Sequence, residues 1–76
     1  MKEMLEALVK SLVDFTDKVS VNEVEGDKFT TLELRVDPSD MGKIIGRQGR
    51  IIRAVRTLMK AYATKENKRL NVEIIE

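Results

Sequence analysis

Two glycines three residues apart, Gly46 and Gly49, interrupt the longest helical pattern in this chain of 76 residues. Glycine adopts backbone conformations that other residues avoid, and it lets another backbone approach closely. The pair therefore predicts a sharp turn between two helices. A short helix should end at Gly46, and a longer one should begin near Gly49 or Arg50 and run to about Thr64.

The short helix has a clear start signal. Asp37 can cap its first turn, Pro38 suits the first helical position, and Asp40 favours the positive helix end. The longer helix has apolar residues at helical spacing, which we expect to be buried. They are Ile51, Ile52, Val55, Leu58, Met59 and Tyr62. Its other face is basic, with Arg50, Arg53, Arg56 and Lys60.

The first 40 residues predict one helix and two strands. Residues 2–16 place apolar side chains in one helical stripe. They are Met1, Met4, Leu5, Leu8, Val9, Leu12 and Val13. Valine and leucine then alternate with polar residues in two runs, at 19–21 and 32–36, as in half-buried strands.

Gly26-Asp27 predicts a two-residue hairpin turn of type II′ between these strands. This turn sets Val21 opposite Leu32 and Val19 opposite Leu34 on the core face. It also places Val24 and Phe29 together on the other face near the tip. A last strand alternates over Leu70, Val72 and Ile74, after a polar loop at 65–69.

The predicted element order is α-β-β-α-α-β. A right-handed crossover through the helix pair sets the third strand parallel to the second. We therefore expect one α+β domain over 1–76, built as a two-layer sandwich. It would have a three-stranded mixed sheet with three helices on one face.

Charge is divided unevenly along the chain. Residues 1–40 have a net charge of −5 and residues 41–76 a net charge of +6. No acidic residue lies between Met41 and Thr64, where there are six basic ones. Such a division predicts an anion-binding face or two complementary protein surfaces.

Several functions are disfavoured. The chain has no Cys and no His, which removes the usual zinc ligands and imidazole catalysis. Ser11, Ser20 and Ser39 therefore lack a His partner. The glycine spacing fits neither a dinucleotide-binding fold nor a P-loop. We expect no enzyme activity, cofactor, metal or small-molecule substrate.

The N-terminal segment is amphipathic and acidic, unlike a signal peptide, and no apolar run approaches the ~20 residues that cross a bilayer. We expect a cytoplasmic protein that does not enter the membrane.

The turn ends at a helix N-terminus, where free N–H groups and the helix dipole favour phosphate. Lys43, Arg47 and Arg50 add positive charge, and Gln48 can hydrogen-bond. The three aromatic residues lie away from the turn in the sequence. We therefore expect weak, salt-sensitive and sequence-tolerant binding, which would need paired domains for avidity.

At Ile45-Gly46-Arg47-Gln48-Gly49-Arg50-Ile51-Ile52 the chain resembles the KH family of RNA-binding domains, and its element order resembles the type II (prokaryotic) KH fold. It is most similar to the small stand-alone bacterial KH proteins of the KhpA type. The resemblance implies that the loop clamps about four nucleotides of single-stranded RNA. It implies phosphate binding at Gly46, Arg47, Gln48 and Gly49. The implied groove is lined by Gly42, Lys43, Ile45, Arg50, Ile51 and Arg53. Residues 34–36 and 65–69 would bound its far side.

The resemblance also implies an RNA chaperone or post-transcriptional regulator linked to cell elongation and division. Its partners would be a second copy of the chain, a larger multidomain KH protein of the KhpB/Jag type, or both.

Two other functions stay open. Two helices joined by a glycine turn also describe a helix-turn-helix, with residues 50–64 as a recognition helix for duplex DNA. Alternatively, the acidic first half could meet the basic second half of a neighbour, which would make the chain a protein assembly module.

Overall fold

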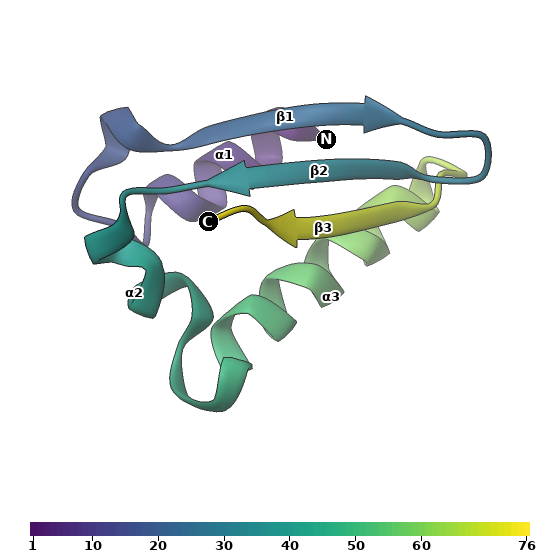
Figure 1. Cartoon of the computed structure of the whole chain (residues 1–76). Coiled ribbons are helices and arrows are strands. Elements are labelled where there is room, and N and C mark those ends of the chain that lie inside the picture. Colours follow the sequence, from purple (N-terminus) through teal and green to yellow (C-terminus); the bar gives the residue numbers. More distant parts are fainter.

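The computed structural model describes all residues, 1–76, and has the predicted order of elements (Figure 1). The elements are α1 (Lys2–Lys10), β1 (Ser20–Glu25), β2 (Thr30–Arg35), α2 (Met41–Ile45), α3 (Arg50–Lys65) and β3 (Leu70–Ile74). Short 3-10 turns precede β1, α2 and α3, at η1 (Thr16–Lys18), η2 (Pro38–Asp40) and η3 (Arg47–Gly49).

The sheet has the order β1-β2-β3, with β1 antiparallel and β3 parallel to β2. The predicted mixed sheet, with the third strand parallel to the second, is confirmed. The helices lie on one side of the sheet, and α2 and α3 form a V that opens toward β2 and β3 (Figure 1).

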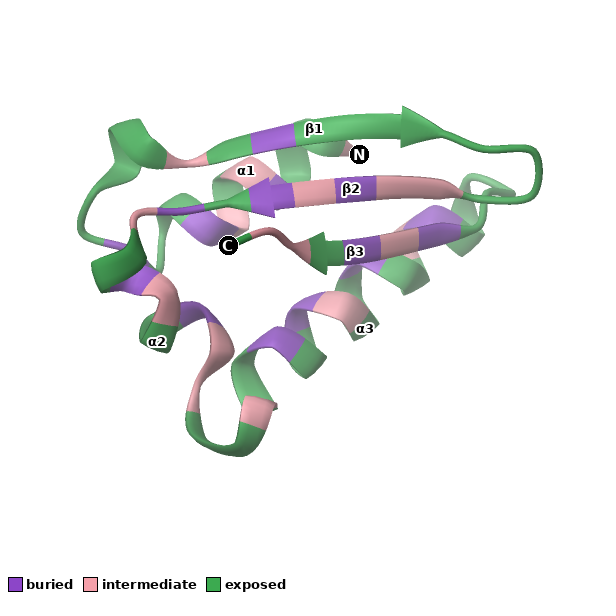
Figure 2. Ribbon diagram, viewed as in Figure 1, coloured by how far each residue is buried: buried purple, intermediate pink, exposed green.

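The core lies between the sheet and the helices. Alternate strand residues, such as Val21, Leu32, Leu34 and Val72, are buried against the helices (Figure 2). Their strand neighbours on the opposite face, including Asn22, are more exposed. A period of two therefore identified the buried face of each strand.

The predicted hairpin turn is wrong. The loop has four residues, Gly26 to Phe29, and Val21 pairs with Leu34 instead of Leu32. Gly26 is not in a positive-φ conformation, which a II′ turn requires. Its N–H instead donates to the Phe29 carbonyl at 3.0 Å, and the Thr30 N–H donates to the Arg69 carbonyl at 2.9 Å. These bonds start β2 at Thr30. The register is shifted by two residues, so every side chain stays on its predicted face.

The first helix is shorter than predicted, because α1 ends at Lys10 instead of near residue 16. The backbone N–H groups of Asp14 and Phe15 donate to the carboxylate of Asp40, and not to carbonyls one turn earlier. This contact draws the chain out of the helix. Val13 still reaches the core, whereas Leu12 is exposed.

The buried stripe of α3 differs from the predicted one: two of its predicted members are exposed, Tyr62 is only half-buried, and one buried residue was not predicted. Leu58 is 57% exposed and Ile51 is 37% exposed, whereas Ala63 is fully buried. The buried line runs through Ile52, Val55, Met59 and Ala63. Sequence spacing could not distinguish the side of α3 that faces the sheet from the side that faces α1 and solvent.

Candidate functional site

The glycine turn lies at the apex of the V between α2 and α3 (Figure 1). Its backbone is left-handed at three residues: φ is 73° at Gly46, 56° at Gln48 and 73° at Gly49. A Cβ on Gly46 would lie 2.3 Å from Cγ1 of Ile51 and 3.0 Å from the Ile51 backbone nitrogen. Both conformation and packing therefore require glycine at position 46.

The other two glycines of the motif have open surroundings. A Cβ on Gly49 would have its nearest neighbour at 4.0 Å, so only its positive φ favours glycine. Gly42 is helical, and a Cβ there would meet nothing within 4 Å. Neither packing nor conformation requires glycine at 42, and its absence of a side chain leaves the surface of α2 open to a ligand.

Two arginines of the basic face are bonded to the backbone. Arg53 donates from Nη2 to the Gln48 carbonyl at 2.7 Å and from Nε to the Gly49 carbonyl at 3.2 Å. Arg56 donates from Nε to the Val72 carbonyl at 3.0 Å. Arg53 therefore braces the glycine turn, and Arg56 ties α3 to β3. The predicted basic face is only partly a free surface.

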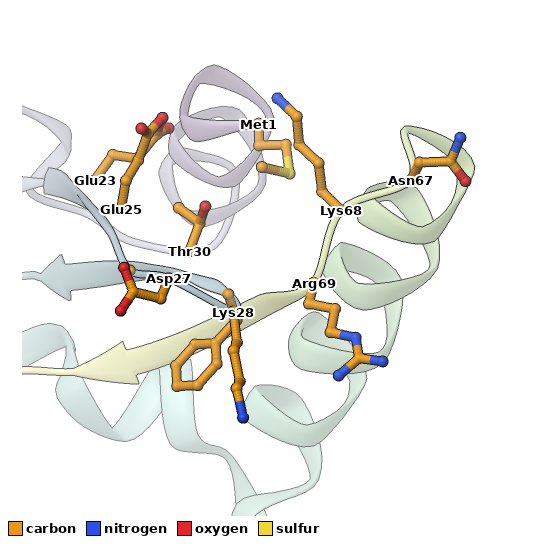
Figure 3. A pocket seen from close by; sticks show the side chains of 11 residues that line it. Met1, Glu23, Glu25, Asp27, Lys28, Thr30, Asn67, Lys68 and Arg69 are labelled. Carbon is orange, nitrogen blue, oxygen red and sulfur yellow. The ribbon is translucent and has the colours of Figure 1, made fainter.

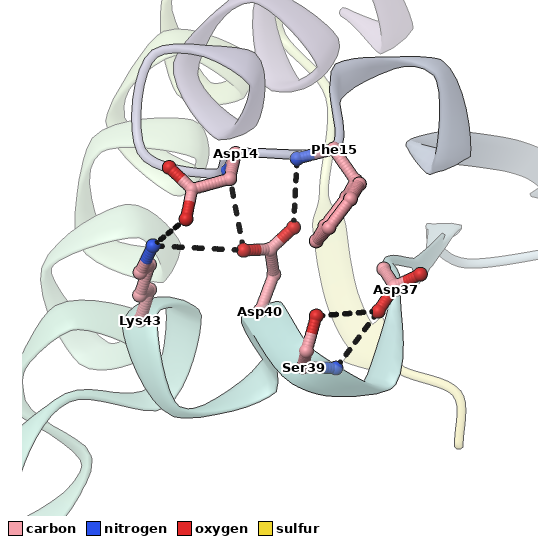
Figure 4. Close-up of polar contacts among 6 residues, drawn as sticks. All are labelled: Asp14, Phe15, Asp37, Ser39, Asp40 and Lys43. Carbon is pink, nitrogen blue, oxygen red and sulfur yellow. Dashed lines mark hydrogen bonds and ion pairs between the residues drawn. The ribbon is translucent and has the colours of Figure 1, made fainter.

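Lys43 takes part in a polar junction between α2 and the segment after α1. Its ammonium bonds the Asp14 carboxylate and lies 3.8 Å from Oδ1 of Asp40 (Figure 4). Hydrogen bonding to Asp14 is the main reason that the pKa of Lys43 is raised, with the charges of Asp14 and Asp40 adding to it. The acid-free stretch around Lys43 gave no sign of this partner, which is 29 residues away.

Asp40 is the centre of that junction and the one buried charged residue of the chain, at 1% exposure. Its Oδ1 accepts the Asp14 N–H at 3.2 Å, and its Oδ2 accepts the Phe15 N–H at 3.0 Å. The sequence suggested only a helix-start role for Asp40. The role predicted for Asp37 is confirmed. Its carboxylate accepts hydrogen bonds from the backbone N–H of Ser39 at 2.9 Å and from the Ser39 hydroxyl at 2.6 Å. The two hydrogen bonds from Ser39 lower the pKa of Asp37.

Positive charge at the apex is left without an internal partner. The side chains of Arg47 and Arg50 make no hydrogen bond or ion pair, and no side chain caps the start of α3. Ile51 is exposed beside them, and Ile45 is half-buried. The apex thus combines free guanidinium groups, a helix N-terminus and apolar surface, which is an arrangement suited to a polyanion carrying apolar groups.

The segments expected to bound the groove lie at different ends of the molecule. Val36 lines a hollow of about 280 Å³ with Pro38, Met41 and Ile75, next to α2. The 65–69 loop follows α3 at the end opposite the glycine turn, roughly 24 Å away for a helix of 16 residues. There it meets the hairpin tip around a hollow of mixed charge, with Glu23, Glu25 and Asp27 opposite Lys68 and Arg69 (Figure 3).

The structure shows neither a membrane-spanning helix nor a metal-binding cluster of side chains. None of its helices is both long enough and apolar enough to cross a membrane. No group of three or more Asp or Glu residues is placed to hold a metal ion.

Comparison with known proteins gives matches along nearly the whole chain. The family model described as "KhpA/KhpB, KH domain" matches residues 2–74. Proteins called RNA-binding protein KhpA are 60% identical in Clostridium acetobutylicum and 59% identical in Clostridium perfringens, each over 99% of this chain and 100% of the relative. The protein of that name from Borreliella burgdorferi is 58% identical over 97% of this chain and 90% of the relative. No solved structure gives a significant match.

Proposed function

Because the chain belongs to the KhpA/KhpB family of KH domains, we propose that it binds RNA and holds about four nucleotides of a single strand at Gly46–Gly49. The observation that carries the proposal is the apex itself. It presents two unpartnered arginines at the uncapped start of a helix. The names of the relatives describe RNA binding and no catalysis, in keeping with a binding protein that is not an enzyme.

Each residue of the apex has a physical role in this proposal. Phosphates lie at the start of α3, where the N–H groups and the dipole are positive. Arg47 and Arg50 contact them as charge-assisted donors. Gln48 hydrogen-bonds the backbone. Gly49 admits the close approach of a nucleotide.

The open surface at Gly42 extends the groove along α2. Bases lie against Ile45 and Ile51, while Arg53 contributes indirectly by bracing the turn. Since no aromatic residue belongs to α2, the glycine turn or the first turns of α3, we expect binding that is weak for one domain and tolerant of sequence.

The alternative of duplex DNA binding by a helix-turn-helix has less support. The helix before the turn, α2, has only five residues. On the helix after it, Arg53 and Arg56 are bonded to backbone carbonyls and are not free to read base edges. Competition between a single-stranded RNA and a DNA duplex of equal length tests this directly. We expect the RNA to win.

The decisive experiment measures RNA affinity and its salt dependence for the variant Arg47→Asp, Gln48→Asp. Both side chains are exposed, so the fold should persist while two carboxylates repel phosphate. We expect affinity for a short single-stranded RNA to fall more than tenfold. A matched control is Ser20→Asp, Lys28→Asp, which makes the same charge change on exposed residues of the β1–β2 hairpin.

If the two double variants bind RNA equally well, the glycine turn is not the clamp. The same pair can be compared in cells by crosslinking, where the control should recover as much RNA as the wild type.

We further propose that two copies of the chain pair through an apolar hollow between α1 and α3. This hollow has a volume of about 650 Å³, and one of the residues that line it is charged. It is lined by Met4, Leu8, Leu58, Ala61, Tyr62 and Lys65. Leu58, at 57% exposure, is more exposed than any other large apolar residue of the chain. A two-fold contact here would bury the same apolar surface of both copies at once, which favours a second copy as the occupant.

The pairing is tested by Leu58→Glu, with Thr57→Glu as the control on the same helix. We expect sedimentation to show a dimer that the first variant, and not the second, converts to a monomer. RNA avidity should fall with it. A wild type that stays monomeric at all concentrations would overturn the homodimer and leave the larger KhpB-type KH protein as the partner to test.

In the cell, we propose that the protein acts as an RNA chaperone or post-transcriptional regulator. A strain lacking it should show altered cell length, and wild-type protein should restore this where the Arg47→Asp, Gln48→Asp variant does not.

A further inference from the structure

Lys43 is the one basic residue of α2, and it precedes the glycine turn by less than one helical turn. Its position suits a phosphate ligand, but its ammonium is turned away from that role. It bonds Asp14 and lies near Asp40, on the side of α2 where the chain leaves α1 (Figure 4).

The junction fixes where the Asp14 carboxylate lies. The backbone N–H of Asp14 is bonded to the buried Asp40, and the next N–H, of Phe15, is bonded to the same carboxylate. The backbone of Asp14 is therefore fixed, and only its side chain must lose conformational freedom to bond Lys43. The Asp14 side chain remains 71% exposed and that of Lys43 47% exposed, so the pair is accessible to solvent and to a ligand.

We propose that Asp14 is an internal competitor of RNA phosphate for Lys43, and so sets the affinity of the glycine-turn site. This proposal rests on the proposed function. In the free protein Lys43 is held by Asp14. When a phosphate approaches α2, it must either displace that carboxylate or bind beside a pair with little net charge.

The strength of this competition follows from exposure. Ion pairs between solvent-exposed side chains are weak, so a polyanion can displace Asp14 at a small cost. Removing the Asp14 charge should therefore raise RNA affinity by about two- to fivefold, the range that corresponds to such pairs. It also frees one cation, so the plot of log affinity against log salt should steepen by up to about 0.7 for single-stranded RNA.

The test is Asp14→Asn, measured against a single-stranded oligonucleotide over a range of salt concentrations. Asn keeps the backbone N–H that Asp40 accepts, so the junction should persist. Asp17→Asn is the matched control, since Asp17 is exposed on the same segment and has no ion-pair partner in the structure. It reports the general effect of removing one negative charge.

Lys43→Gln provides the second arm. If Asp14 acts through Lys43, Asp14→Asn should raise affinity in the wild-type background and leave it unchanged in the Lys43→Gln background. A gain that persists without Lys43, or that Asp17→Asn reproduces, would overturn the proposal.

A measurement without RNA separates this proposal from the function on which it rests. The Asp14 hydrogen bond raises the pKa of Lys43, so Asp14→Asn should lower it and speed acetylation of Lys43 at fixed pH, read by mass spectrometry. An unchanged rate of acetylation would overturn the proposal that Asp14 competes with phosphate for Lys43. Faster acetylation with no RNA binding by the wild type would instead overturn the proposed function and keep the ion pair.

Discussion

The two ends of α2 show how differently one short helix can use charge. At its start, the carboxylates of Asp14 and Asp40 and the ammonium of Lys43 are partnered with one another and with backbone amides. At its end, the exposed guanidinium groups of Arg47 and Arg50 have no partner. One end resembles an interior contact and the other an open binding surface.

This difference indicates that one end of α2 positions the helix and the other contacts the ligand. A five-residue helix cannot position a loop through its own stability. The Asp40 junction fixes its start, the buried Ile44 fixes its middle, and Arg53 braces the turn that follows. These supporting contacts engage some of the charged side chains around α2. The guanidinium groups at the apex remain unpartnered, and they are the ones that a polyanion can reach.

The largest effect should come from disrupting the turn itself with Gly46→Ala. Gly46 has φ of 73° and ψ of −180°, a region essentially restricted to glycine that costs another residue roughly 1–3 kcal/mol. The close contact with Ile51 adds roughly 1–3 kcal/mol of overpacking. We expect the free energy of unfolding to fall by roughly 2–6 kcal/mol, measured by urea denaturation.

Gly49→Ala is the comparison for Gly46→Ala, because Gly49 has the same φ but a left-handed ψ of 19° and no close contact. It should lose only the roughly 1–2 kcal/mol of a left-handed conformation. Equal losses at both positions would mean that neither the contact with Ile51 nor the backbone conformation of Gly46 is costly.

The junction is tested next by Asp40→Asn, which replaces one acceptor oxygen with a donor that faces a backbone N–H. An unsatisfied buried donor costs roughly 1–3 kcal/mol, and we expect a loss in that range. RNA affinity of the folded variant should fall while its salt slope stays unchanged, since Asp40 is buried away from phosphate. A changed slope would mean that the charge of Asp40, 3.8 Å from the Lys43 ammonium, also controls how far Lys43 is free to bind phosphate.

Gly42→Ala should separate stability from function in the opposite direction. Alanine in a helix interior is favoured over glycine by roughly 0.5–1 kcal/mol, and a Cβ at 42 meets no neighbour. We expect a more stable protein that binds RNA less tightly, because the methyl group narrows the approach to α2. A stabilised variant with full affinity would place the RNA elsewhere.

The smallest effect concerns pH and the cap at Asp37. Hydrogen bonds from Ser39 lower the pKa of this carboxyl below its ordinary value of 3.8. Because the folded state binds the proton less readily, the cap stabilises fully above about pH 3.8 and is lost as pH falls through the folded pKa. Asp37→Asn should flatten this part of the acid denaturation curve without changing RNA binding at neutral pH.

Patterns within short segments were enough to predict much of the fold. Period-two alternation identified the core faces of the strands, Gly46 identified the end of α2, and Pro38 identified the start of the 3-10 turn η2 that precedes it. The hairpin register was wrong because a hydrogen bond from Thr30 to Arg69, 39 residues further on, helps decide where β2 begins. Leu58 was expected in the core for a similar reason: helical spacing places a residue on a stripe but does not say what packs against it.

The sequence by itself determined the element order, the left-handed turn at Gly46–Gly49 and the positive charge beside it. These depend on glycine conformation, helix-start residues and local composition, all of which act over a few residues. Tertiary structure decided which of the charges stay free. Coulombic and hydrogen-bond partners are chosen by distance in space, so folding brought Asp14 to Lys43 and the Val72 carbonyl to Arg56. Folding also placed Arg47 and Arg50 at the apex, where no acidic side chain or carbonyl of the chain bonds them.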